Sequence, residues 1–285
     1  MGAVTAIKLT TRRVEKPWGR RVLWPAFDDA MNCEEPVGEI WFEMPGGREP
    51  ELLVKYLFTS EKLSIQVHPD DAAAQARGFA RGKDEAWVIL DAEPGSTIAI
   101  GTREVMTREQ LRTAAINGSI EDSLFWKPVR AGDAFYSPAG TVHAIGAGLT
   151  LVEVQQNVDL TYRLWDYGRP RELHLEDGIA VSNPVPYVAP HVPRELEMGR
   201  MILCDGPKFV LERWHAAGSG ELAATADRPL WIIPLTGRGE VDGNTMAAGE
   251  VWFAESPAAL TLEDGSDVLI AYPGADVIDA LWVRG

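Results

Sequence analysis

The stretch Leu63-Ser64-Ile65-Gln66-Val67-His68-Pro69-Asp70 alternates apolar and polar side chains until it reaches a proline. This alternation predicts a β-strand with Gln66 and His68 on one face, because successive side chains of a strand point to opposite sides of the sheet. Seventeen residues after His68, Glu85 opens the apolar run Ala86-Trp87-Val88-Ile89-Leu90, which has the length of another strand. The two runs predict a sheet region that presents an amide, an imidazole and a carboxylate.

A second histidine, His143, follows a glycine- and proline-containing motif that begins at Gly132. The spacing is glycine, five residues, Pro-x-Gly, two residues and histidine. A lone histidine on a strand is more often structural than a metal ligand, and Glu85 alone reads equally well as a solvated charge. The chain has only five histidines, however, and two of them occur in these settings. The combined nitrogen and oxygen donors indicate a divalent metal site, with zinc, manganese, cobalt and ferrous iron as suitable ions.

The overall composition is that of a globular chain with one large or two modest domains. It has 285 residues, of which 46% are hydrophobic and 24% charged. Its 27 glycines, 19 prolines and many short β-branched or aromatic runs favour a mainly β fold. The net charge of −15 argues against nucleic acid or an anionic membrane as a partner.

The location of the protein is expected to be cytoplasmic. Residues 1–8 show no signal-peptide pattern, and no apolar stretch approaches the roughly 20 residues needed to span a bilayer. Cys33 and Cys204 lie far apart in the sequence and are expected to be two reduced thiols.

Two helical regions are expected among the strands. Residues 70–78 predict one short helix with Asp70 or Asp71 as its N-cap. Residues 107–124 predict two short helices separated at Gly118, and Thr107 with Gln110 forms a capping-box pattern at the start. The second region places a helical insertion at about residues 103–126, between the segments that carry Glu85 and His143.

Proline-rich residues 183–193 predict a linker between two domains, 1–183 and 184–285. In the second domain, Gly249–Pro257 repeats the pattern of Gly132–Pro138, but no residue there corresponds to His143. We therefore expect a second β domain of the same type that holds no metal.

Several motifs occur in the order found in type I mannose-6-phosphate isomerases, and over its first 180 residues the chain resembles the short bacterial form of that family. The motifs are Lys16-Pro17-Trp18-Gly19, Gly38-Glu39-Ile40-Trp41, residues 63–70, Lys83-Asp84-Glu85, residues 138–144 and Asp159-Leu160-Thr161-Tyr162-Arg163. The resemblance implies a mainly β fold of two cupin-type (jelly-roll) β-barrels, with the small helical insertion in the N-terminal half.

The resemblance also implies roles for individual residues. It implies that one Zn2+ per chain is held by Gln66, His68, Glu85 and His143. It assigns Arg163 to the active site, where a guanidinium binds a phosphate or an enediolate, and Lys55 and Ser64 to the substrate pocket.

The base that transfers the proton is left open between Glu153 and Lys83. Glu153 faces either the pocket or solvent, and a shuttle role for Lys83 requires a lowered pKa. Two positions depart from the related patterns. Ala147 stands where the general cupin motif has asparagine, and Gly82 stands where longer family members often have histidine.

The resemblance implies an isomerase that interconverts mannose 6-phosphate and fructose 6-phosphate through a cis-enediol. One alternative is a cupin-type iron oxygenase that uses His68, Glu85 and His143 as a two-histidine, one-carboxylate triad. Another is a non-catalytic sugar-binding cupin. The expected partner is a small sugar phosphate, in a protein that is a monomer or a homodimer. The range of sugar epimers stays open.

Overall fold

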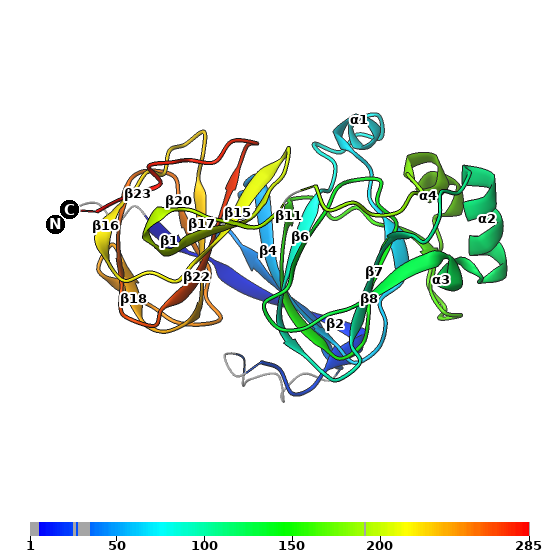
Figure 1. The fold of residues 1–285 in the computed structure, drawn as a ribbon, viewed down its shortest axis with the longest axis horizontal. Helices are drawn as coiled ribbons and strands as arrows, with labels where there is room; N and C mark the ends of the chain where they lie inside the picture. The colour runs from blue at the N-terminus through cyan, green and yellow to red at the C-terminus, as the bar shows by residue number, and fades with distance from the viewer. Residues whose placement is uncertain (1–5, 25–26, 28–34, 191, 285) are drawn as a thin grey trace.

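The computed structural model describes residues 6–24, 27, 35–190 and 192–284, which form a mainly β protein. The strands assemble into antiparallel sheets that are grouped into two bodies lying side by side (Figure 1). We refer to them as the N-terminal body and the C-terminal body. The predicted mainly β, cupin-type fold is confirmed.

The N-terminal body consists of a six-stranded and a five-stranded sheet. In spatial order, the six-stranded sheet contains β2 (Thr10–Arg20), β3 (Val37–Glu43), β4 (Leu52–Thr59), β11 (Leu149–Gln156), β6 (Glu85–Ala92) and β9 (Ala134–Ser137). The five-stranded sheet contains β12 (Tyr162–Trp165), β5 (Ile65–Val67), β10 (His143–Ile145), β7 (Thr97–Thr102) and β8 (Leu124–Pro128).

The C-terminal body consists of a seven-stranded and a five-stranded sheet. The larger sheet contains β1 (Ala6–Lys8), β20 (Trp252–Ala254), β17 (Leu230–Thr236), β22 (Asp267–Pro273), β15 (Phe209–Trp214), β14 (Arg200–Asp205) and β13 (Arg194–Glu195). The smaller sheet contains β19 (Asn244–Met246), β18 (Gly239–Val241), β21 (Ala258–Leu262), β16 (Gly218–Leu222) and β23 (Trp282–Arg284). The strand nearest the N-terminus, β1, therefore pairs within the C-terminal body.

The helices lie outside the sheets of the N-terminal body. They are α1 (Asp71–Gln75), α2 (Arg108–Asn117), α3 (Ile120–Ser123) and α4 (Leu175–Val181), and a 3-10 turn, η2, spans Glu197–Gly199. Helices α2, α3 and α4 gather at the end of the molecule farthest from the C-terminal body (Figure 1). In the described residues no helix is long and apolar enough to cross a membrane.

Both faces of the six-stranded sheet are buried, and this explains how its polar residues are positioned. Alternate residues such as Val54, Val88 and Val152 pack against the seven-stranded sheet in one continuous core. The residues between them, such as Leu57 and Trp87, join a second core inside the N-terminal body. Odd-numbered positions of β4, β6 and β11 therefore face the interior, because side chains of a strand alternate between its faces.

The local helix signals predict the observed helices well. Asp70 is the N-cap of α1, and Thr107 and Gln110 form the expected capping box of α2. Gly118 ends α2 in the left-handed conformation (φ 82°), so the predicted interruption is confirmed. The predicted strand at residues 63–70 is shorter than expected, at Ile65–Val67. In the N-terminal body, sequence reasoning missed strands β2, β7 and β12 and helix α4.

Of the two cysteines, Cys204 is a free, buried thiol, and burial raises its pKa. Cys33 lies outside the described residues.

Candidate metal centre and active site

Two rows of cross-strand neighbours form the polar interior of the N-terminal body. On the six-stranded sheet, Glu153 lies opposite Lys55 on one side and Trp87 on the other. On the five-stranded sheet, Gln66 lies opposite His143 and Arg163. Members of both rows line a cavity of about 430 Å³. Strand pairing therefore brings together residues that are far apart in the sequence.

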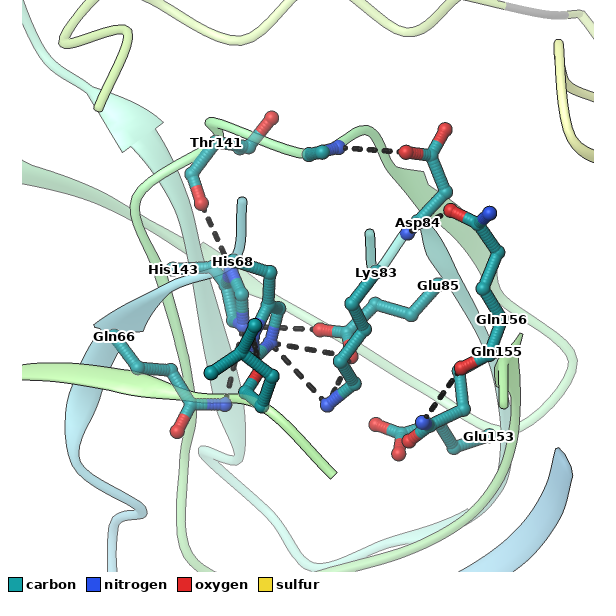
Figure 2. Close-up of polar contacts among 12 residues, drawn as sticks. Gln66, His68, Lys83, Asp84, Glu85, Thr141, His143, Glu153, Gln155 and Gln156 are labelled. Atoms are coloured by element: carbon teal, nitrogen blue, oxygen red, sulfur yellow. Dashed lines mark hydrogen bonds and ion pairs between the residues drawn. The ribbon is translucent and has the colours of Figure 1, made fainter. Parts of the chain in front are cut away.

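Three buried ligand-type side chains converge beside this cavity (Figure 2). His143 Nε2 lies 2.9 Å from Glu85 Oε1, and His68 Nε2 lies 3.4 Å from Glu85 Oε2. One ligand atom from each of the three residues lies within 4.8 Å of the other two. The structure thus brings together both histidines and the carboxylate that the sequence singled out.

The hydrogen bonds of the two imidazoles define which nitrogen is free. His68 Nδ1 lies 3.0 Å from the carbonyl of Leu160, and His143 Nδ1 lies 2.9 Å from the carbonyl of Thr141. A carbonyl oxygen only accepts hydrogen bonds, so each Nδ1 carries a proton and Nε2 is the nitrogen that is left to bind a metal ion. Burial, together with the ammonium of Lys83, lowers the pKa of His68 to about 3, which keeps that ring neutral.

The carboxylate of Glu85 supplies the test of whether a cation fits here. Both Glu85 oxygens are buried, and their neighbours are the two imidazole nitrogens and the ammonium of Lys83, 3.0 Å from Oε2. Two imidazole nitrogens and a carboxylate thus converge at close range, which is the arrangement that coordinates a divalent cation. The donor set therefore fits a divalent metal ion.

Gln66 lies at the edge of this cluster, with its amide nitrogen 3.2 Å from His143 Nε2. Ser64 Oγ donates to Gln66 Oε1 over 3.2 Å. The nitrogen and oxygen of an amide exchange places by a half-turn, and Ser64 then accepts instead of donating. Gln66 is thus within reach to offer its oxygen to an ion held by the other three residues.

Lys83 is buried beside the cluster, with Nζ 3.0 Å from Glu85 Oε2 and 3.3 Å from His68 Nε2. Burial acts to lower the pKa of Lys83, but the carboxylates of Glu85 and Glu153 outweigh it and raise the pKa. These surroundings favour a permanent ammonium over the proton shuttle considered from the sequence.

At Gly82, the position where longer family members often have histidine, a Cβ atom would lie 2.4 Å from the Asp70 carbonyl carbon, so a histidine side chain has no room there.

Glu153 points into the interior, which decides between the two orientations left open by the sequence. Its Oε2 accepts a hydrogen bond of 3.1 Å from Trp87 Nε1, and its Oε1 lies 3.5 Å from Lys55 Nζ. Burial raises the pKa of Glu153, and the charge of Glu85 adds to this effect. Glu153 is thus a buried carboxylate that favours its protonated form more than an ordinary glutamate does.

Sequence reasoning assigned no role to Glu39, although it lies in the Gly38–Trp41 motif. Its Oε2 accepts a 2.6 Å hydrogen bond from Trp41 Nε1 and lies 3.7 Å from Lys55 Nζ. Burial acts to raise the pKa of Glu39, but Lys55 and Lys16 outweigh it and lower the pKa. Lys55 therefore bridges two carboxylates, and it is buried rather than extended to solvent.

Arg163 lines the opposite wall of the cavity, together with Arg171 and His174. Arg163 Nε donates to the Glu172 carbonyl over 2.9 Å. Burial lowers the pKa of Arg163, and the neighbouring charge of Arg171 contributes. Arg171 is held by Asp166 through two bonds of 2.6 and 2.8 Å. Arg171 and His174 were missed by sequence reasoning, and their only signal was a cluster of basic residues after Arg163.

No family model matches the sequence. The mannose-6-phosphate isomerase of Streptococcus mutans is 37% identical over 199 residues, which cover 67% of this chain and 62% of that protein. A Bacillus subtilis protein described as "Probable mannose-6-phosphate isomerase GmuF" is 31% identical over 214 residues, which cover 71% of this chain and 67% of that protein. The match to the Streptococcus protein thus spans less than two thirds of its length.

Solved structures share the fold over nearly the whole chain. The crystal structure of the mannose 6-phosphate isomerase from Bacillus subtilis has a TM-score of 0.77 at 26% identity, covering 94% of this chain and 99% of that one. A zinc-bound mannose 6-phosphate isomerase has a TM-score of 0.70 at 14% identity, covering 95% of this chain and 100% of that one. At that identity the second comparison shows the shared fold alone.

Proposed function

Since the chain belongs to the mannose-6-phosphate isomerase family, we propose that it interconverts mannose 6-phosphate and fructose 6-phosphate. The observation that carries the proposal is the buried His68–Glu85–His143 cluster, whose ligand atoms lie within 4.8 Å of one another beside a polar cavity. We assign one Zn2+ to this cluster, with Gln66 as the fourth ligand. Zinc accepts this mixture of nitrogen and oxygen donors, and a zinc-bound isomerase shares the fold.

The isomerisation moves a proton between C2 and C1 of the open-chain sugar and builds negative charge on the enediolate oxygens. When bound, the metal ion polarises the sugar carbonyl and stabilises this charge. The residues of the chain must bind the sugar, orient C1 and C2, and accept and return the proton.

Glu153 is our choice for the residue that carries the proton. Its carboxylate lines the cavity, and Lys55 and Trp87 hold its two oxygens in fixed directions. A raised pKa makes a carboxylate a stronger base, which favours removal of a weakly acidic carbon-bound proton. Lys83 lines the same cavity as an ammonium and is assigned to stabilise negative charge next to the metal.

Substrate binding is assigned to Arg163, Lys55 and Ser64, which all line the cavity. Arg163 presents a planar, permanently charged donor group, which suits a phosphate or an enediolate oxygen. Ser64 contacts Gln66 and thereby links substrate binding to the metal ligands. The wall opposite Glu153 is thus cationic, as an anionic substrate requires.

A coupled assay on chelator-treated protein tests the proposal. Mannose 6-phosphate is supplied alone and with zinc, manganese, cobalt or ferrous iron, and formation of fructose 6-phosphate is followed. We expect no activity without metal and restored activity with zinc, whereas unphosphorylated mannose should react poorly. Iron-dependent oxygen uptake without isomerisation would instead support the oxygenase reading. Sugar-phosphate binding without turnover would support a binding protein.

A further inference from the structure

The side chain of Asp84 is buried next to Glu85 but points away from the metal cluster (Figure 2). Its Oδ2 accepts a 2.6 Å hydrogen bond from Tyr136 Oη, and its Oδ1 accepts a 3.0 Å bond from the backbone N–H of Ala139. Ala139 belongs to the Pro-x-Gly turn that leads to His143. One carboxylate therefore ties the segment that carries Glu85 to the segment that carries His143.

A second carboxylate, Asp71, extends this network to the segment that follows His68. Its Oδ1 accepts from the backbone N–H of Gly82 over 2.8 Å and from Gln156 Nε2 over 3.0 Å. Gln156 Oε1 in turn accepts from the backbone N–H of Asp84 over 3.0 Å. The backbones that carry His68, Glu85 and His143 are thus joined by side chains that do not themselves face the cavity.

The C-terminal body reaches this network through its residues 206–209. Lys208 Nζ lies 2.5 Å from Asp71 Oδ2. The ring of Tyr136 packs against Phe209 with centroids 5.2 Å apart. At Gly206 a Cβ atom would lie 2.1 Å from Tyr136 Cζ, so glycine there leaves the space that the phenol ring occupies. The second body is therefore shaped around a residue that holds Asp84.

We propose that Asp84 and Tyr136 are positioning residues through which the C-terminal body holds the metal-ligating segments in place. The inference rests on the metal centre proposed above and not on the identity of the sugar. Partners that orient ligand-bearing groups commonly change metal affinity by roughly 10- to 100-fold when they are removed. Here the orientation acts on whole backbone segments and not on a single ligand side chain.

Tyr136→Phe is the first test, because it removes one hydroxyl and keeps the ring packed on Phe209. Zinc affinity is measured on the full-length protein by competition with a chromophoric chelator. We expect the zinc Kd to rise by about tenfold. The lost activity should return at excess zinc, since the assigned zinc ligands and Glu153 are unchanged.

Tyr187→Phe is the matched control. Tyr187 Oη donates to the carbonyl of Tyr136 over 2.7 Å, so this variant also loses one hydroxyl that bonds at the same place. Among the described residues, Tyr187 forms no hydrogen bond with Asp84. The zinc Kd of Tyr187→Phe should therefore stay within about twofold of the wild-type value. Equal zinc affinities of both variants and wild type would overturn the inference, whatever the loss of thermal stability.

Lys208→Met tests the other contact with a surface substitution that leaves the core intact. Its expected effect on the zinc Kd is smaller, about threefold, because the pair with Asp71 is partly solvated. The control is Arg194→Met, which breaks a 2.6 Å ion pair with Asp205 inside the C-terminal body. A change of zinc affinity in the control as large as in Lys208→Met would reject the specific route through Asp71.

These measurements separate the inference from the proposed function. Zinc binding by wild-type protein tests the metal centre, and sugar turnover tests the reaction. The ratio of variant to wild-type zinc Kd tests the positioning role, whether or not the sugar is turned over.

Discussion

Each body buries a charged cluster in its interior, and the two clusters differ in what surrounds the carboxylate. In the C-terminal body, Glu212 accepts two hydrogen bonds from Arg200, at 2.8 and 2.9 Å. It also accepts one from Tyr272 Oη at 2.6 Å and one from Trp214 Nε1 at 2.7 Å. In the N-terminal body, Glu85 Oε2 lies 3.0 Å from Lys83 Nζ, and the two Glu85 oxygens face imidazole nitrogens at 2.9 and 3.4 Å.

The difference separates a structural cluster from a binding site. The cluster around Glu212 contains its own cation, and the remaining Arg200 donors reach the carbonyls of Ile278 and Asp279. The cluster around Glu85 also contains a cation, Lys83, but it gathers two imidazole nitrogens around the same carboxylate and adjoins a cavity. Two histidines and a carboxylate whose ligand atoms lie within 4.8 Å of one another form a donor set typical of a metal site, which the arginine-paired Glu212 does not.

The largest expected effect concerns the C-terminal cluster. Arg200→Met should lower the free energy of unfolding by about 3–5 kcal/mol, because it leaves Glu212 as an unpaired buried charge. Urea unfolding of the metal-free protein measures this loss. Adding Glu212→Leu should restore part of the stability, and zinc affinity should change in neither variant. A stable Arg200→Met protein with weakened zinc binding would reverse the roles given to the two clusters.

His143→Ala should abolish metal binding. It should lower the free energy of unfolding of the metal-free protein less than Arg200→Met does. At a zinc concentration of 100 times its Kd, wild-type protein should gain about 2.7 kcal/mol over the metal-free form. The variant should show no such gain and no zinc-dependent activity. Thermal unfolding with and without zinc measures the difference. A zinc-induced rise in Tm equal to that of wild type would exclude His143 as a ligand.

Arg163→Ala should keep the metal and lose turnover. We expect kcat/KM to fall by about 30-fold, equivalent to about 2 kcal/mol of transition-state stabilisation. Arg169→Ala is a matched control, because Arg169 lies in the same segment, pairs with Asp166 and does not line the cavity. A decrease of less than about threefold for Arg163→Ala, or an equal decrease for Arg169→Ala, would contradict the role of Arg163.

The smallest expected effect is a pH dependence of the metal-free protein. The pKa of His68 is about 3 in the folded state, against the ordinary 6.5 of an unfolded chain. The unfolded chain therefore binds a proton below pH 6.5 that the folded state excludes, so stability falls as the pH drops from 6.5 toward 3. The slope contributed by His68 approaches about 1.4 kcal/mol per pH unit.

His68→Gln should flatten this slope, as measured by urea unfolding of chelator-treated protein between pH 7 and 5. His215→Gln in the C-terminal body is the control, because the side chain of His215 is 57% exposed. An unchanged slope in His68→Gln would show that burial of this imidazole does not govern the acid sensitivity.

Local signals in the sequence predict local structure well. The capping box at Thr107 and the glycine at 118 act within a few residues, so the start and end of α2 follow from neighbours in the chain. Helix α4 offers no such signal. Its N-cap, His174, makes no side-chain capping bond. The helix has only seven residues, and one of them is Gly178, where a Cβ atom would lie 2.6 Å from Leu164 Cδ2. Strand β2 was missed because it is rich in charge and contains Pro17 and Gly19.

The candidate metal ligands follow from motifs, but the surroundings of the site depend on long-range packing. All eight residues of β11 are buried, so no alternation between buried and exposed residues reveals which way Glu153 points. The direction becomes known only when the seven-stranded sheet is seen to cover one face of β11. Similarly, the contacts of Asp84 with Tyr136, and of Lys208 with Asp71, join residues separated by 52 and 137 positions. No local pattern encodes such pairs.

The placement of β1 bears on how the chain matures during synthesis. Ala6, Ile7 and Lys8 pair with residues 252–254, and Thr10 already begins the first strand of the N-terminal body. A nascent chain that has emerged as far as residue 165 carries every strand of the N-terminal body, whereas β1 still has no partner. Domains fold as units while translation proceeds, so β1, although it precedes the N-terminal body in the chain, pairs only after β20 has been synthesised. Its pairing joins residues that are 244 to 248 positions apart, from Lys8 with Trp252 to Ala6 with Ala254.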